Sequence, residues 1–172
     1  MKRRWGQITT GIKDWLNKVK NDNILVSLFT FDSTSYKGPM YNTPSELLGA
    51  LNEGIEANGG DNVLTSVGLD TFVEIMQSEQ RVSKGTLNWL HYGAMLIGED
   101  SEYPDKAINS LIEFKREKNI KFFFNVVSEV KKKIKLTTLA TALEGVHYSL
   151  RNKADIGKGF AEALERDPMV SY

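Results

Sequence analysis

The sequence contains no cysteine and only 4 prolines among its 172 residues. The absence of cysteine excludes thiol catalysis, disulfide bonds and cysteine-ligated zinc. The fold must therefore rest on a hydrophobic core, which a chain of this length can form because it buries about 70% of its unfolded surface. With no cysteine, and no apolar signal core after the basic start MKRRW, the sequence favours an intracellular location but does not identify the compartment.

The chain also lacks an excess of charge of either sign. Lys and Arg number 22, as do Asp and Glu, so no overall field draws the protein toward nucleic acid or an anionic membrane. No segment approaches the roughly 18 apolar residues of a membrane span. The lysines of residues 131–135 have no aromatic residues among them, which favours a solvated loop over a nucleic-acid site. We therefore expect neither nucleic acid nor a membrane as a partner.

Apolar runs alternate with amphipathic segments along the chain. Residues 24–31, 90–97 and 120–127 are near-continuous apolar runs, typical of strands buried on both faces, and 146–148 predicts a shorter strand. Helical periodicity marks residues 5–19, 44–55, 64–76, 104–114, 136–143 and 156–164. Thr43 and Glu46 form a capping box before the second helix, and Gly145 ends the fifth. This alternation predicts an α/β fold, with a doubly wound, mostly parallel sheet flanked by helices in one domain over 1–172.

Five segments occur in an order that resembles one known family. They are ILVSLFTFDS at 24–33, GGDNV at 59–63, GEDSEYPDKAI at 98–108, IKFFFNVV at 120–127 and LTTLATALEGVHY at 136–148. Together, over residues 4–164, they resemble the von Willebrand factor A (integrin I-like) domain. The resemblance implies a Rossmann-like sheet with a metal-ion-dependent adhesion site at its C-terminal edge, where open α/β sheets bind ligands. In that family D-x-S-x-S, G-G-T and T-D-G loops hold magnesium, and a partner protein adds a carboxylate.

The chain departs from the family pattern at all three loops. D-x-S-x-S is absent, Asp61 replaces the threonine of G-G-T, and Gly98-Glu99-Asp100 stands where T-D-G is expected. The metal site is therefore expected to be degenerate, with Asp61 and Asp100 as candidate ligands. No cofactor is predicted, and magnesium is implied only where a D-x-S-x-S loop is supplied.

The strand that carries the first loop in the family is also missing. In the family it lies at the centre of the sheet, so its loss leaves a gap between residues 24–31 and 90–97, where backbone groups lack partners. We interpret the chain as truncated, because Met1-Lys2-Arg3-Arg4-Trp5 matches the continuation of the family motif. Coding sequence upstream of Met1 tests this hypothesis, and self-association through the incomplete sheet is a further expectation.

The leading functional hypothesis is a protein-interaction module without catalytic residues. Partners are expected on the loops at the strand C-termini, at residues 33–36, 60–62 and 98–102, and the candidate binding residues are Ser33, Ser35, Asp61, Asn62, Glu99 and Asp100. For the acidic residues the alternative is a solvated loop or a helix N-terminus.

Two other functions remain open. One is a magnesium-dependent hydrolase that uses Asp61 or Asp100, and the other is a non-functional fragment of a larger protein of the family. His91 and His147 lie in strand-like runs, which favours structural histidines over general bases. The segment DIGKG at 155–159 lacks the pattern of a phosphate-binding loop, and we discard that interpretation.

Overall fold

A computed structural model describes residues 4–56, 65–78, 91–97, 105–118, 122–128, 134–150 and 155–165. Its elements follow the alternation that the sequence predicts. In chain order they are α1 (Trp5–Lys18), β1 (Phe29–Phe31), β2 (Ser35–Lys37), α2 (Pro44–Glu53), α3 (Thr65–Ser78), β3 (His91–Ile97), α5 (Asp105–Lys118), β4 (Phe122–Ser128), α6 (Ile134–Ala142), β5 (His147–Ser149) and α7 (Ile156–Leu164).

Two groups of strands form the central layer. The strands β3, β4 and β5 make a parallel sheet in that spatial order, with Ala94 opposite Asn125 and Val127 opposite Tyr148. The helices α5 and α6 make the crossovers that parallel strands require. The strands β1 and β2 pair with each other in antiparallel orientation. The prediction of an α/β fold with a parallel sheet and flanking helices is thus confirmed in outline.

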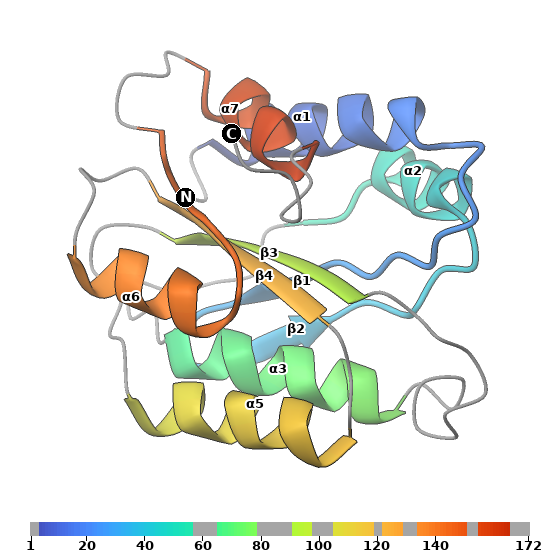
Figure 1. Cartoon of the computed structure of the whole chain (residues 1–172). Coiled ribbons are helices and arrows are strands. Elements are labelled where there is room, and N and C mark those ends of the chain that lie inside the picture. The colour runs from blue at the N-terminus through green and yellow to red at the C-terminus, as the bar shows by residue number, and fades with distance from the viewer. Residues whose placement is uncertain are drawn as a thin grey trace.

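Helices cover both faces of this strand layer. Figure 1 shows α1, α2 and α7 over one face and α3, α5 and α6 over the other. The two neighbours Val126 and Val127 of β4 are both fully buried, one in each of the two hydrophobic clusters. Because successive side chains of a strand point to opposite faces, the sheet is buried on both sides.

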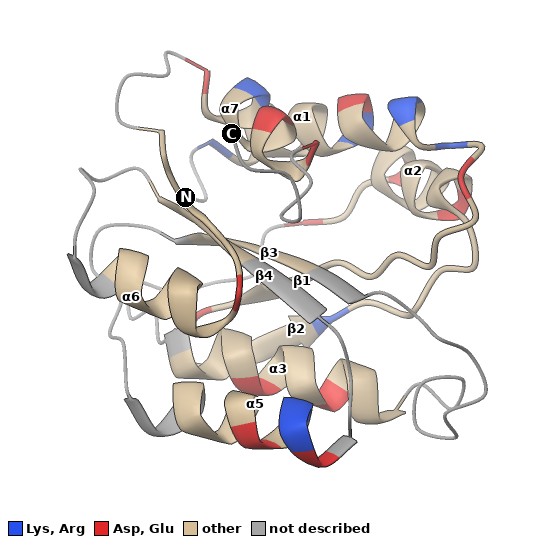
Figure 2. Cartoon of the chain, in the orientation of Figure 1, with Lys and Arg blue, Asp and Glu red and all other residues tan. Residues whose placement is uncertain are grey.

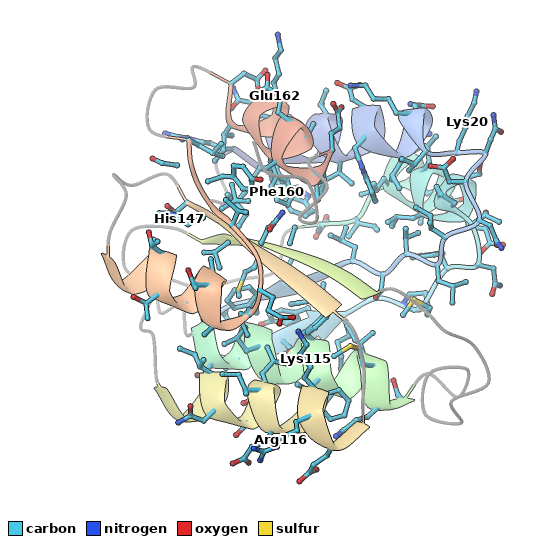
Figure 3. The ribbon with its side chains drawn as sticks, in the orientation of Figure 1. Lys20, Lys115, Arg116, His147, Phe160 and Glu162 are labelled. Carbon is cyan, nitrogen blue, oxygen red and sulfur yellow. The ribbon has the colours of Figure 1, made fainter. Side chains whose placement is uncertain are left out.

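The two clusters draw on different helices. One joins α3, α5 and α6 to β3 and β4 through Leu69, Met76, Met95, Leu111, Phe114, Val126, Leu136, Leu139, Ala140 and Leu143. The other joins α1, α2 and α7 to the opposite face through Ile8, Ile12, Leu16, Val26, Leu47, Leu51, Val127, Leu150, Ile156, Phe160 and Ala163. Figure 3 shows Phe160 on α7, above the strands.

The helices α1 and α7 approach each other through glycine. A Cβ atom added at Gly11 would lie 2.0 Å from the carbonyl oxygen of Gly157, and one added at Gly157 would lie 1.7 Å from the oxygen of Gln7. These neighbours are backbone atoms, which cannot rotate away. The segment DIGKG therefore packs α7 against α1, and its Asp155 carboxylate accepts hydrogen bonds from the N–H groups of Gly157 (2.9 Å) and Lys158 (3.1 Å). Asp155 is thus the N-cap of α7.

The capping box of α2 forms as the sequence predicts. The Thr43 hydroxyl accepts from the backbone N–H of Glu46 at 3.3 Å, and the Glu46 carboxylate accepts from the N–H of Asn42 at 2.9 Å. At the end of α6 the prediction of Gly145 as the terminating residue needs correction. Glu144 adopts the left-handed conformation with φ 55°, while Gly145 donates its N–H to Ala140 at 2.8 Å. This is a Schellman motif whose left-handed position is not a glycine.

The predicted strand at residues 24–31 is shorter than expected. Only Phe29–Phe31 forms β1, preceded by an isolated bridge between Val26 and Tyr41. In the part of the chain that the structure describes, β1 and β3 belong to separate sheets, which is compatible with the predicted gap between residues 24–31 and 90–97. The shortening has a physical reason, because a strand with a neighbour on one side only has half the backbone pairing that holds a central strand straight.

Candidate functional site

The candidate site is the edge of the sheet at which its parallel strands end. The strands β3, β4 and β5 are parallel, and β1 runs in the same direction as β3 in Figure 1. The turn after β1 and the last residue of β4 therefore lie at this edge. Of the predicted binding residues, Ser33 and Ser35 are in the turn after β1, while Asp61, Asn62, Glu99 and Asp100 lie outside the described residues.

The turn after β1 is built around Asp32, which sequence reasoning did not select. Its side chain is buried to 7% exposure, and Oδ1 accepts the backbone N–H of Thr34 at 2.7 Å. The backbone N–H of Asp32 also donates to the oxygen of Thr34 at 2.9 Å. This Asx turn fixes the loop and leaves Ser33 exposed and Ser35 half-buried. The Asp-Ser-Thr-Ser composition of the turn was the available signal for it.

A second polar group lies at the end of β4. Ser128 Oγ is 2.8 Å from Nε2 of His147, and the Thr137 hydroxyl of α6 is 3.4 Å from Nδ1 of the same ring. Figure 3 labels His147 at this end of the strands. Asn125, fully buried on β4, accepts the backbone N–H of Val146 at 2.9 Å. The group holds α6 and β5 against β4.

A serine next to a histidine suggests nucleophilic catalysis, but the surroundings favour a structural role. Ser128 has no exposed surface, so its hydroxyl cannot reach a substrate as the structure stands. The Thr137 hydroxyl lies beside Nδ1 of the ring, and both residues hold α6 and β5 together. The interpretation of His147 as a structural histidine agrees with this geometry. The side chain of His91 lies outside the described residues.

The residues available for binding a metal are limited. Among the residues that the structure describes, no three His, Asp or Glu side chains gather closely enough to hold an ion. The candidate ligands Asp61 and Asp100 both lie outside the described residues. Asp32 alone does not make a magnesium site, because hard cations take several oxygen ligands.

The described surface has mixed charge. In Figure 2, α1 and α7 each carry acidic and basic residues while α2 carries acidic residues only, and Lys18 of α1 pairs with Glu165 after α7. A similar pair joins Lys115 of α5 to Glu144 after α6. Within the described ranges, none of the helices is long and apolar enough to cross a membrane.

Comparison with known proteins supports the fold and goes no further. No protein-family model matches the chain, and no curated protein matches its sequence. The structure is similar to the crystal structure of an aerotolerance-related membrane protein from Bacteroides fragilis that carries multiple mutations to serine. That likeness has a TM-score of 0.58 at 8% identity and covers 95% of this chain and 87% of the other. At this identity the likeness shows a shared α/β fold alone.

Proposed function

We propose that this domain binds another protein at the C-terminal edge of its sheet, without catalysis and without a metal ion of its own. The observation that carries the proposal is the ordered turn after β1. There the buried Asp32 carboxylate holds the loop in place and Ser33 faces solvent. Ligands of open α/β sheets bind at this edge, and binding residues commonly lie on loops held by a rigid scaffold.

Two further observations support binding over hydrolysis. The one serine–histidine pair among the described hydrogen bonds has its hydroxyl buried, and it packs α6 and β5 against β4. Among the described residues, no three His, Asp or Glu side chains gather to hold an ion. The coarse likeness to a solved structure fits a binding module, although it names no partner.

The proposal is tested with two charge variants at opposite edges of the sheet. Ser33→Arg changes the exposed turn after β1, while Asn21→Arg adds the same charge to the exposed connection between α1 and β1. Figure 3 labels Lys20, next to Asn21, at the end of the molecule away from His147. Both variants are expected to fold with unchanged circular dichroism, because both positions are exposed.

The measurement is capture of partners by the immobilised domain, with mass spectrometry of what is retained in EDTA. We expect a partner that the wild type and Asn21→Arg retain equally, and that Ser33→Arg retains about tenfold less, as rim charges in an interface can do. Equal retention by the two variants contradicts docking at this edge. Loss of the wild-type partner in EDTA contradicts the metal-free form of the proposal, and turnover of phosphoester or ester substrates contradicts binding as the sole function.

A further inference from the structure

In the described part of the chain, two strand edges in the core face each other without pairing. Phe31 of β1 and Met95 of β3 both lie beside Gly68 of α3, because a Cβ atom built there would be 2.8 Å from Phe31 Cζ and 3.0 Å from Met95 Sδ. On the opposite face, Leu28 and Leu96 pack against the same hydrophobic cluster of α1, α2 and α7. The edges of β1 and β3 therefore lie in one layer, between the same two layers of helices (Figure 1).

The backbone of residues 26–32 shows which groups point toward β3. Val26 exchanges hydrogen bonds with Tyr41 at 3.1 and 2.8 Å, and the Leu28 oxygen accepts from Gly38 at 3.1 Å. The backbone N–H and C=O groups of the even-numbered residues therefore point toward β2. Because alternate residues of a strand direct their N–H and C=O groups to opposite edges, three residues direct theirs toward β3: Ser27, Phe29 and Phe31.

The same reasoning applies to β3. The N–H of Val126 donates to the Val146 oxygen at 3.0 Å. The backbone groups of even-numbered residues of β4 therefore point toward β5, and those of odd-numbered residues point toward β3. Asn125 stands opposite Ala94, and in parallel pairing it bonds the residues on either side of Ala94. The groups left for the other edge of β3 belong to Tyr92, Ala94 and Leu96. Among the residues that the structure describes, no strand pairs with that edge.

Ser27, whose backbone groups point toward β3, also has an unsatisfied side chain. Its hydroxyl oxygen is buried and has no hydrogen-bond partner among the residues that the structure describes. A buried polar group without a partner costs free energy that a bound donor or acceptor would recover. Ser27 thus adds a side-chain site to the two rows of unpaired backbone groups.

We propose that the facing edges of β1 and β3 accept a β-strand donated by a different protein. The backbone edges on both sides dictate an extended segment, which pairs with both strands as in β-strand addition. The two apolar clusters above and below dictate side chains that are apolar and β-branched on both faces, as in buried parallel strands. β3 has 7 residues, which sets the length of the donated strand.

A second copy of this chain is a poorer donor than a different protein. The strands β1 to β5 that the structure describes are all paired within their own sheets, so a second copy would have to break its fold to supply one. This surface is separate from the edge loops of the proposed function, and neither proposal depends on the other.

The test uses a synthetic peptide of seven alternating valine and isoleucine residues with two lysines at each end. Its matched control carries N-methyl groups on alternate residues, which removes hydrogen-bond donors while keeping the side chains. Isothermal titration calorimetry is expected to show one bound peptide per domain, with the methylated peptide weaker by about tenfold or more. The free energy of binding is expected to come from backbone pairing. The methylated peptide, which keeps the hydrophobic side chains, should therefore bind more weakly.

Amide hydrogen exchange by NMR identifies the site of binding. The peptide is expected to slow exchange at Phe29, Phe31, Ala94 and Leu96. Thr30 and Met95, whose N–H groups are already paired within the sheets, serve as internal controls. Several results overturn the proposal: no binding, equal affinity for the two peptides, or protection elsewhere. So does protection of the four amides without peptide in a chain that sediments as a dimer, because a second copy then pairs with these edges.

Discussion

Single residues set the closeness of the packing in this protein. Gly11 and Gly157 let two helices meet at their backbones, and Ser27 places an unpaired hydroxyl inside the molecule. Asp32 and Asn125 are buried polar residues that each accept a backbone N–H. The energetic effect of a buried polar group depends on its partner, so Ser27 and Asp32 should respond to substitution in opposite directions.

Ser27→Ala is expected to raise the free energy of unfolding by about 1 kcal/mol, because it removes a buried hydroxyl without a hydrogen bond. Urea denaturation followed by circular dichroism measures the change. Ser33→Ala, at an exposed position, is the control and should change stability by less than about 0.5 kcal/mol. Destabilisation by Ser27→Ala would show that the hydroxyl has a partner in solution.

Gly11→Ala is expected to lower the free energy of unfolding by about 3 kcal/mol, since its Cβ would lie 2.0 Å from the Gly157 oxygen and force the helices apart. Gly6→Ala in the same helix is the matched control, because a Cβ there meets nothing within 4 Å. Alanine in place of a helical glycine should stabilise by about 0.5–1 kcal/mol. Thermal unfolding measures the melting temperatures of both variants. Equal melting temperatures would contradict the close crossing of α1 and α7.

Secondary-structure elements are held by their ends as much as by their faces. The helices α2 and α7 begin at side-chain caps, Thr43 and Asp155, that accept backbone N–H groups. The helix α6 ends in a Schellman motif in which Glu144 donates its N–H to Thr141 at 3.0 Å. Glu144 therefore combines an unfavourable backbone conformation with an ion pair to Lys115.

Comparison of Glu144→Gly with Glu144→Ala separates these two effects. Both variants lose the ion pair with Lys115, but only glycine relieves the left-handed backbone at φ 55°. We expect Glu144→Gly to be more stable than Glu144→Ala by about 1 kcal/mol. Chemical denaturation of the pair measures the difference, and equal stability would mean that the helix end relaxes in solution.

At the scale of the whole molecule, the divided strand layer is the dominant feature. Each hydrophobic cluster joins one set of helices to one face of the strands. Side chains rather than backbone pairing connect β1 to β3, since the two strands belong to separate sheets among the described residues. The described strands therefore form two sheets between the two hydrophobic clusters, and this is the feature on which the proposed strand addition rests.

Magnesium is expected to leave the melting temperature of the whole domain unchanged. A site saturated at 100 times its dissociation constant would add about 2.7 kcal/mol, or about 5–11 °C for a domain of this size. Differential scanning calorimetry in magnesium and in EDTA, matched for ionic strength, measures the shift. An increase of several degrees would show that residues such as Asp61 and Asp100 form a working site.

The order of elements was determined by the sequence alone. Apolar periodicity placed α1, α3 and α5 and the buried strands β3 and β4 within a few residues, because amphipathic faces and capping signals are local properties. The Thr43–Glu46 box is likewise local. The resemblance to a known family indicated that a central strand is missing. It therefore predicted a gap between residues 24–31 and 90–97.

Tertiary structure decided what depends on residues far apart in the chain. Two contacts join separate elements: that of Gly11 with Gly157, and that of Ser128, Thr137 and His147. No local pattern encodes them, because each depends on how helices cross a sheet. The shortening of β1 to three residues is of the same kind. The length of a strand depends on the strands that pair with it. The residues of β1 alone therefore do not determine where β1 begins and ends.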